Sequence, residues 1–163
     1  MMRLDRLSAL EGLRLRAIRL RAVLDAPDVF ATTFSEYSAW PLDRWTAQLQ
    51  GPPIFIAVED GRDVGMVRCS NHEQLARTAW LVQLWVEPSA RQKGIAGALV
   101  DAVVAWARLN GFERLILDVG RDNAPAISLY NSRGFIANGQ LGTLPSPRDH
   151  VCEQQMELRL LLR

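Results

Sequence analysis

The sequence predicts a mixed α/β fold, an α+β arrangement in which a strand hairpin comes first and a strand-helix-strand-helix section follows. Two apolar or alternating runs flank Asp60-Gly61, a dipeptide that favours a tight hairpin turn. Further along, short apolar runs alternate with helical patterns. This order is typical of a mixed sheet covered by helices. The length of 163 residues suits one domain, and we assign residues 1–163 to a single domain.

The first elements are a short strand around Arg3 to Leu7 and the helix that follows it. Ser8 can cap this helix, and Asp25-Ala26-Pro27 ends it. The apolar positions that recur at helical spacing are Leu10, Leu13, Ala17, Leu20 and Leu24. We expect them to face the core.

The remaining elements are apolar runs bounded by glycines, prolines and helix caps. They are a helix from Pro41 to Gly51-Pro52-Pro53, strands at Ile54 to Glu59, Asp63 to Ser70 and Trp80 to Val86, a helix that runs to Asn110 and is ended by Gly111, a buried strand at Leu115 to Val119, a helix from Asn123, and strands at Phe135 to Gln140 and about Val151 to Leu160. Val29 to Tyr37 is compatible with either a loop or a partial helix, and Leu141 to Asp149 is predicted to be a flexible link.

Composition and charge indicate an ordinary soluble globule. Hydrophobic residues make up 48% of the chain and the net charge is +1, so we expect neither nucleic acid nor a membrane as partner. Cys69 and Cys152 are the only cysteines and form no metal-ligand pattern, so no metal is expected. No stretch approaches the roughly 18 to 20 apolar residues needed to span a bilayer. We therefore expect a cytoplasmic protein.

A glycine-bearing loop, Arg91-Gln92-Lys93-Gly94-Ile95-Ala96-Gly97, joins the fourth expected strand, Trp80 to Val86, to the helix after it. At a helix N-terminus several N–H groups lack partners and the helix dipole adds partial positive charge, so such a loop can bind a phosphate or pyrophosphate through its main chain. It contains neither the Gly-x-Gly-x-x-Gly of dinucleotide sites nor the Gly-Lys-Ser/Thr of a P-loop. Taken alone, the pattern also fits a simple strand-to-helix turn.

A second motif follows about thirty residues later, in Asn123-Ala124-Pro125-Ala126-Ile127-Ser128-Leu129-Tyr130-Asn131-Ser132-Arg133-Gly134-Phe135. Asn123 is a good helix N-cap and Gly134 suits the helix end. The two motifs, in the forms Arg-x-x-Gly-x-Ala and Asn-x-x-Ala-x-x-Leu-Tyr-x-x-x-Gly-Phe, resemble those of the GCN5-related N-acetyltransferases (GNAT superfamily). The resemblance is strong over roughly Thr78 to Gln140. It implies a twisted mixed sheet of six to seven strands with about four helices.

The resemblance also implies that acetyl-CoA is the co-substrate and that its pantetheine arm lies between two strands that separate. The main-chain groups expected to pair with this arm belong to Leu84, Trp85 and Val86. The amides expected around the pyrophosphate belong to Gln92, Lys93, Gly94, Ala96 and Gly97, with side-chain charge from Arg91 and Lys93. Asn123 is expected to bind the cofactor arm.

Acetyl transfer to an amine needs an uncharged nitrogen, stabilisation of an oxyanion and a proton for the departing thiolate. By resemblance, Tyr130 is the general acid. Asp118 is the candidate base, because ribosomal-protein N-terminal alanine acetyltransferases of the family carry a glutamate at the matching position. The alternatives are that Asp118 is an outward carboxylate or an arginine partner, that water replaces a dedicated base, or that His72 or His150 titrates instead.

The acceptor is expected to be a primary amine on a small molecule or a peptide N-terminus. By resemblance it would be shaped by the segments Asp25 to Leu42 and Leu141 to His150, neither of which matches a specific acceptor class. The chain could also form a homodimer. The alternative function is a catalytically silent acyl-CoA-binding sensor or partner domain, and the presence of Tyr130 argues against it.

Overall fold

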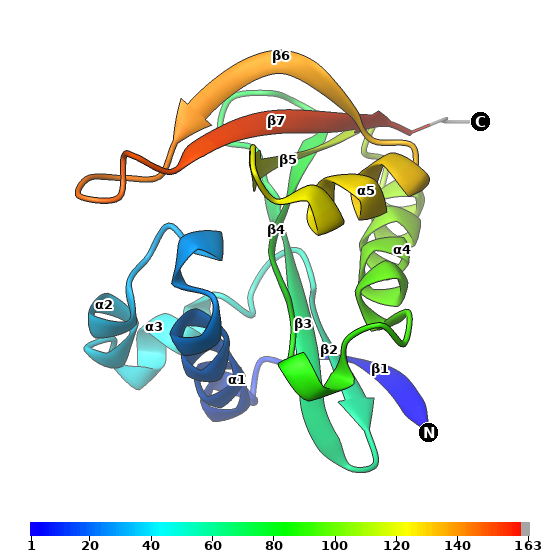
Figure 1. The fold of residues 1–163 in the computed structure, drawn as a ribbon. Helices are drawn as coiled ribbons and strands as arrows, with labels where there is room; N and C mark the ends of the chain where they lie inside the picture. The colour runs from blue at the N-terminus through cyan, green and yellow to red at the C-terminus, as the bar shows by residue number, and fades with distance from the viewer. Residues whose placement is uncertain (161–163) are drawn as a thin grey trace.

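The computed structural model describes residues 1–160, and within them the chain has a mixed α/β fold (Figure 1). In chain order the elements are β1 (Met2–Arg6), α1 (Gly12–Asp25), the 3-10 turn η1 (Pro27–Val29), α2 (Phe34–Ser38), α3 (Leu42–Ala47), β2 (Ile54–Glu59), β3 (Arg62–Asn71), β4 (Thr78–Val86), the 3-10 turn η2 (Pro88–Ala90), α4 (Ile95–Leu109), β5 (Arg114–Gly120), α5 (Ala124–Ser132), β6 (Ile136–Thr143) and β7 (Cys152–Arg159). The expected fold class is confirmed. In this part of the chain, no helix combines the length and the apolar character needed to cross a membrane.

The strands form one seven-stranded sheet in the order β1-β2-β3-β4-β5-β7-β6. Every neighbouring pair is antiparallel except β4 and β5, which run parallel. These two strands pair only where Thr78, Ala79 and Trp80 lie beside residues 114–116. Both strands continue beyond this contact, β4 to Val86 and β5 to Gly120, but they do not pair with each other again. The centre of the sheet is therefore split toward the carboxyl ends of β4 and β5.

Helices cover both faces of the sheet (Figure 1). On one face α4 packs against β2, β3 and β4, and its Leu99, Val100 and Val103 are fully buried. On the other face α1, α2 and α3 enclose a second core that includes Ile18 and Trp45. Each fully buried aliphatic side chain contributes roughly 1.5–3 kcal/mol. The core beneath α4 includes Leu81 of β4 and Leu117 of β5, so it holds the two halves of the split sheet together.

The predicted orientation of the first helix is wrong. Leu13 and Leu24 are exposed, and Leu10 lies in the turn before α1 with 95% of its surface exposed. The buried face of α1 consists instead of Gly12, Leu15, Ile18, Arg19, Ala22 and Val23. Apolar residues recur at helical spacing on both faces of this helix, so the pattern gave no unique face, and the true core face includes an arginine that the pattern excluded.

Several boundaries also differ from the prediction. Ser8 is not the helix cap: Glu11 holds that position, and its carboxylate accepts a hydrogen bond from the Ser8 backbone N–H at 2.7 Å. The segment Val29 to Tyr37, whose sequence was compatible with either a loop or a partial helix, contains the start of α2. This helix is capped by reciprocal hydrogen bonds between Thr33 and Glu36. β6 extends to Thr143 because its pairing with β7 resumes at Leu141 after an irregularity. The expected hairpin turn is present, with positive φ at both Asp60 and Gly61.

Candidate active site

The glycine loop lies between η2 and α4, and its backbone is shaped for close approach to a ligand. Gly94 is the N-cap of α4 with φ of 80°, and Gln92 also has a positive φ of 63°. In the described part of the chain no side chain caps this helix, so the N–H groups of its first turn have no acceptor from the cap. A cavity of about 310 Å³ opens here, and its walls are Val86, Ala90, Arg91, Gln92, Gly94, Ile95, Ala96, Gly97, Pro125 and Leu129.

The two cationic side chains of this loop are held in ion pairs with carboxylates. Arg91 Nη2 lies 2.7 Å from Asp25 Oδ2, and its Nε donates to the Val86 carbonyl at 2.9 Å. Lys93 Nζ donates to Glu59 Oε1 at 2.9 Å. Their charges are thus engaged at the edge of the loop, and the main-chain amides are the groups that remain for an anion.

Arg133 is a further cation near this loop, and no sequence motif indicated it. It caps the C-terminal end of α5, and its guanidinium lies so close to Gly97 that a Cβ at that position would overlap it. Gly97 therefore permits the approach of α5 to the first turn of α4. The side chain of Arg133 also pairs with Asp101 on α4 at 3.3 Å. Both contacts join segments that are distant in the sequence, so only the three-dimensional packing reveals them.

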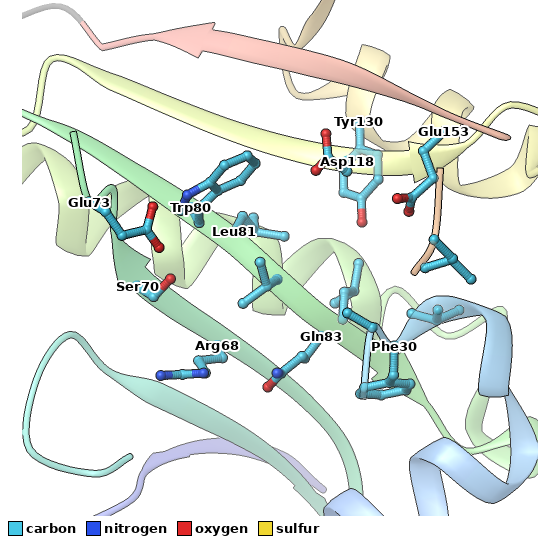
Figure 2. Close-up of a pocket in the computed structure, with 15 residues that line it drawn as sticks. Phe30, Arg68, Ser70, Glu73, Trp80, Leu81, Gln83, Asp118, Tyr130 and Glu153 are labelled. Carbon is cyan, nitrogen blue, oxygen red and sulfur yellow. The ribbon is translucent and has the colours of Figure 1, made fainter. Parts of the chain in front are cut away.

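The split between β4 and β5 contains two further cavities, of about 340 and 630 Å³. Their shared wall consists of Val29, Leu84, Asp118, Tyr130 and Glu153. Figure 2 shows the side chains of Tyr130, Asp118 and Glu153 gathered at one end of the smaller cavity. Asn123 lines the larger cavity and caps α5, its side-chain oxygen accepting from the Ala126 N–H at 3.3 Å. The expected acid, the expected base and the expected arm-binding residue thus lie around one opening.

The hydroxyl-bearing side chain of Tyr130 comes from α5 and is only 6% exposed. Burial raises its pKa above the ordinary range for a phenol, because the charged phenolate would lose its water. The group therefore stays protonated at neutral pH and can donate a proton.

Asp118 and Glu153 are two carboxylates on one face of the sheet. Asp118 pairs in register with Gln155 on β7, and Glu153 lies two residues from Gln155 on the same strand, so all three side chains share a face. Loss of water raises the pKa of both carboxyls, and the charge of Asp118 raises that of Glu153 further. Glu153 was missed as a site residue because sequence alternation gives a residue's face but not its partner strand.

The other titratable candidates have different surroundings. His72 Nδ1 accepts from the backbone N–H groups of Gln74 and Leu75 at 3.1 and 2.9 Å, and its ring stacks on Trp80. His72 is therefore an acceptor that closes a turn. His150 lines the larger cavity. Trp85 on β4 was expected to contribute its main-chain groups to the cofactor site. Its side chain turns away from the split: it is 5% exposed and its Nε1 donates to Asp25 at 2.9 Å.

The family model of the GNAT acetyltransferases matches residues 20–135, which include both sequence motifs. The chain belongs to the GNAT acetyltransferase family. Human N-acetyltransferase 8 is 34% identical over 94 residues, which cover 56% of this chain and 41% of that protein. Mycothiol acetyltransferase from Brachybacterium faecium is 28% identical over 145 residues, covering 80% of this chain and 43% of that protein. The chain thus spans about two-fifths of the length of these GNAT relatives.

Solved GNAT structures share the whole fold. An acetyltransferase of the family from Streptococcus pneumoniae has a TM-score of 0.83 at 17% identity, over 99% of this chain and 100% of that one. The Salmonella typhimurium protein yncA, solved with its cofactor acetyl-CoA, has a TM-score of 0.82 at 19% identity, over 100% of this chain and 96% of that one. At these identities the likeness establishes the GNAT fold alone.

Proposed function

We propose that this chain is an acetyl-CoA-dependent N-acetyltransferase that moves an acetyl group to a primary amine on a small molecule or a peptide N-terminus. The observation that carries the proposal is the position of Tyr130, a buried, protonated phenol at the split between β4 and β5. The main-chain cradle of the glycine loop lies on the other side of α5, which contributes Pro125 and Leu129 to that cavity. One helix therefore borders both the anion cradle and the reaction cleft.

In this proposal the amides of Gln92, Lys93, Gly94, Ala96 and Gly97 surround the pyrophosphate of acetyl-CoA, with Arg91 at the edge of the loop. The free N–H groups in the first turn of α4 support the assignment, as does the absence of a side-chain cap. Main-chain groups of Leu84, Trp85 and Val86 pair with the pantetheine arm along the section of β4 that does not pair with β5, and Asn123 binds the same arm from α5. The Val86 carbonyl already accepts from Arg91, so Leu84 and Trp85 carry most of this pairing.

The transfer itself is a direct attack on the thioester. The neutral amine nitrogen forms a bond to the carbonyl carbon, and the bond from that carbon to sulfur breaks. The Tyr130 hydroxyl donates its proton to the departing thiolate, and solvent then reprotonates the phenolate. The proton lost by the amine passes to a carboxylate, Asp118 or its neighbour Glu153, directly or through water. The raised pKa values of these carboxyls suit them to accept that proton.

Calorimetric titration with acetyl-CoA tests the proposal, with desulfo-CoA, ATP and NAD as comparison ligands. We expect binding that is specific to the CoA ligands, followed by thiol release when an amine library is added. Absence of binding would remove the acetyltransferase assignment. Binding without thiol release from any amine would instead favour the acyl-CoA-binding sensor or partner domain.

A further inference from the structure

Arg19 on α1 is a fully buried cation that has no carboxylate partner among residues 1–160. Its exposed fraction is 0%, and its Nη1 donates to Gln48 Oε1 at 2.9 Å. Within residues 1–160, its Nε and Nη2 have no hydrogen-bond partner. The guanidinium carbon lies 5.3 Å from the centre of the Tyr37 ring and 5.6 Å from that of Trp45, so aromatic faces supply part of its stabilisation. Burial lowers its pKa to about 10, which leaves it charged at neutral pH.

Arg68 on β3 is a second cation close to the first. The two guanidinium groups repel each other, and no carboxylate is among the groups that shift the pKa of either. Arg68 is half-buried and lines the cavity of about 340 Å³ that also contains Tyr130. Its strand is irregular between Met66 and Arg68. Arg68 therefore brings positive charge to the wall of the reaction cleft, with Arg19 behind it.

The opposite end of the same cavity carries negative charge. Asp118 and Glu153 line it beside Tyr130, and Figure 2 shows Arg68 and Gln83 lying across the cavity from them. No salt bridge joins the described residues to either carboxylate, and none of the groups that shift their pKa values is a cation. The cavity is thus cationic at β3 and anionic at β5 and β7.

Unpaired charges in a partly desolvated site raise the free energy of the folded protein, and a ligand group of opposite charge offsets that cost when it binds. Gln83 supports the same conclusion, because its Nε2 donates weakly to the Tyr37 hydroxyl at 3.4 Å while its buried Oε1 has no partner within residues 1–160. Glu73, the remaining acid of this cavity, is exposed. The unmet requirement is for an anion at one end and a cationic or polar nitrogen at the other.

We propose that the acceptor is a small amino acid-like molecule in which several bonds separate the two charged groups, so that its carboxylate binds Arg68 while its amine lies at Asp118 and Glu153, beside Tyr130. This inference rests on the proposed acetyltransferase function and narrows its substrate class. A planar guanidinium can bind a carboxylate through two parallel hydrogen bonds, which orients the ligand as well as holding it. The positive charge of Arg19 strengthens the potential at Arg68. An internal peptide or a simple alkylamine lacks this carboxylate and would leave the arginines unpaired.

The test compares ligands that differ only in charge. The protein is saturated with desulfo-CoA, which cannot accept or donate an acetyl group, and titrated with L-lysine and with linear ω-amino acids of increasing length, each compared with its carboxamide. We expect at least one acid to bind about tenfold or more tightly than its carboxamide, the difference that one charge-assisted contact supplies. Equal affinities for every pair in the wild-type protein would overturn the proposal.

Amino-acid substitutions identify the residue that causes the preference for the acid over its carboxamide. Arg68→Gln should remove the preference for the acid, and Arg68→Lys should retain part of it. Arg44→Gln is the matched control, because Arg44 is exposed, stacks on Trp40 at 4.0 Å and does not line the cavity. If the preference persists in Arg68→Gln with a normal melting temperature, the carboxylate site has been wrongly placed.

Thiol release from acetyl-CoA separates this inference from the proposed function. Release with peptide or alkyl amines, without any preference for a carboxylate, would retain the transferase and remove the amino acid site. A carboxylate preference that depends on Arg68, without release from any amine, would retain the charged site and remove the transferase.

Discussion

The charge of Asp118 raises the pKa of Glu153, which lies across the β5–β7 pair on the same face of the sheet. Loss of water raises the pKa of both carboxyls as well. A carboxyl whose pKa is raised in the folded state binds more protons there than in the unfolded chain. Its ionisation therefore lowers the free energy of unfolding as pH rises from its unfolded pKa through its folded pKa.

Neutral replacements of these carboxyls should stabilise the fold at neutral pH. Asp118→Asn and Glu153→Gln each remove a charge that is unfavourable above the folded pKa, but Asp118 is exposed and Glu153 is only half-buried, so solvent screening keeps the effect small and the melting temperature at pH 7 should rise by about 1 °C or less. At pH 3, where both carboxyls of the wild-type protein hold protons, the difference should vanish. Melting curves between pH 3 and pH 7 measure this difference, and a stabilisation that grew stronger in acid would contradict the upward direction of the pKa shifts.

The same two variants identify the proton acceptor of the proposed reaction. The variant with the larger loss of turnover has lost the carboxylate that accepts the proton from the amine.

Tyr130→Phe should lower turnover about 100-fold or more, the usual contribution of a general acid. Acetyl-CoA affinity should change little, because the substitution removes one hydroxyl and retains the packed ring against Phe135. Steady-state kinetics with the best amine and calorimetry with acetyl-CoA measure the two quantities. Turnover at the wild-type level would show that the thiolate leaves without a proton from Tyr130.

Gly94→Asp should weaken acetyl-CoA binding strongly. The substitution places a negative charge beside the proposed pyrophosphate and puts a side chain where φ is 80°. Gly111→Asp is the matched control, because Gly111 has the same φ of 80° but follows the other end of α4. Calorimetry should show weaker binding for the first variant alone. Equal losses in both would mean that backbone strain, rather than charge at the loop, explains the effect.

Asp25→Ala should destabilise the protein by about 1–3 kcal/mol. The Asp25 carboxylate accepts from the buried Trp85 Nε1 at 2.9 Å and from Arg91 Nη2 at 2.7 Å, so its removal leaves an indole N–H without a partner. Urea unfolding measures the change, with Asp149→Ala at an exposed position as control. Equal effects of the two substitutions would show that Asp25 adds nothing specific.

Local sequence signals predicted most of the sheet and the cofactor side of the site. Asp60-Gly61 identified the hairpin, Gly94 the start of α4, and Asn123 the start of α5, because the backbone geometry of each depends on its own residue type. The acceptor side could not be predicted in the same way. Arg68 and Glu153 reach one cavity through strand pairing between distant segments, and Arg19 was hidden by a helix with apolar residues on both faces.

Arg19→Met separates a functional role of the buried cation from a structural one. The substitution replaces an unpaired buried charge with an apolar side chain of similar length, which should leave the free energy of unfolding unchanged or raise it by about 1–4 kcal/mol. The loss of the cation–π contacts with Tyr37 and Trp45 opposes this gain by roughly 0.5–2 kcal/mol.

In Arg19→Met the difference in affinity between an acid and its carboxamide should also become smaller, since less positive charge remains behind Arg68. Urea unfolding and the titrations with desulfo-CoA measure the two effects on one preparation. A protein that kept its carboxylate preference but lost several kcal/mol of stability would show that Arg19 serves the fold, whereas a stable protein with weakened discrimination would show that this cost in stability is retained for recognition of the acceptor.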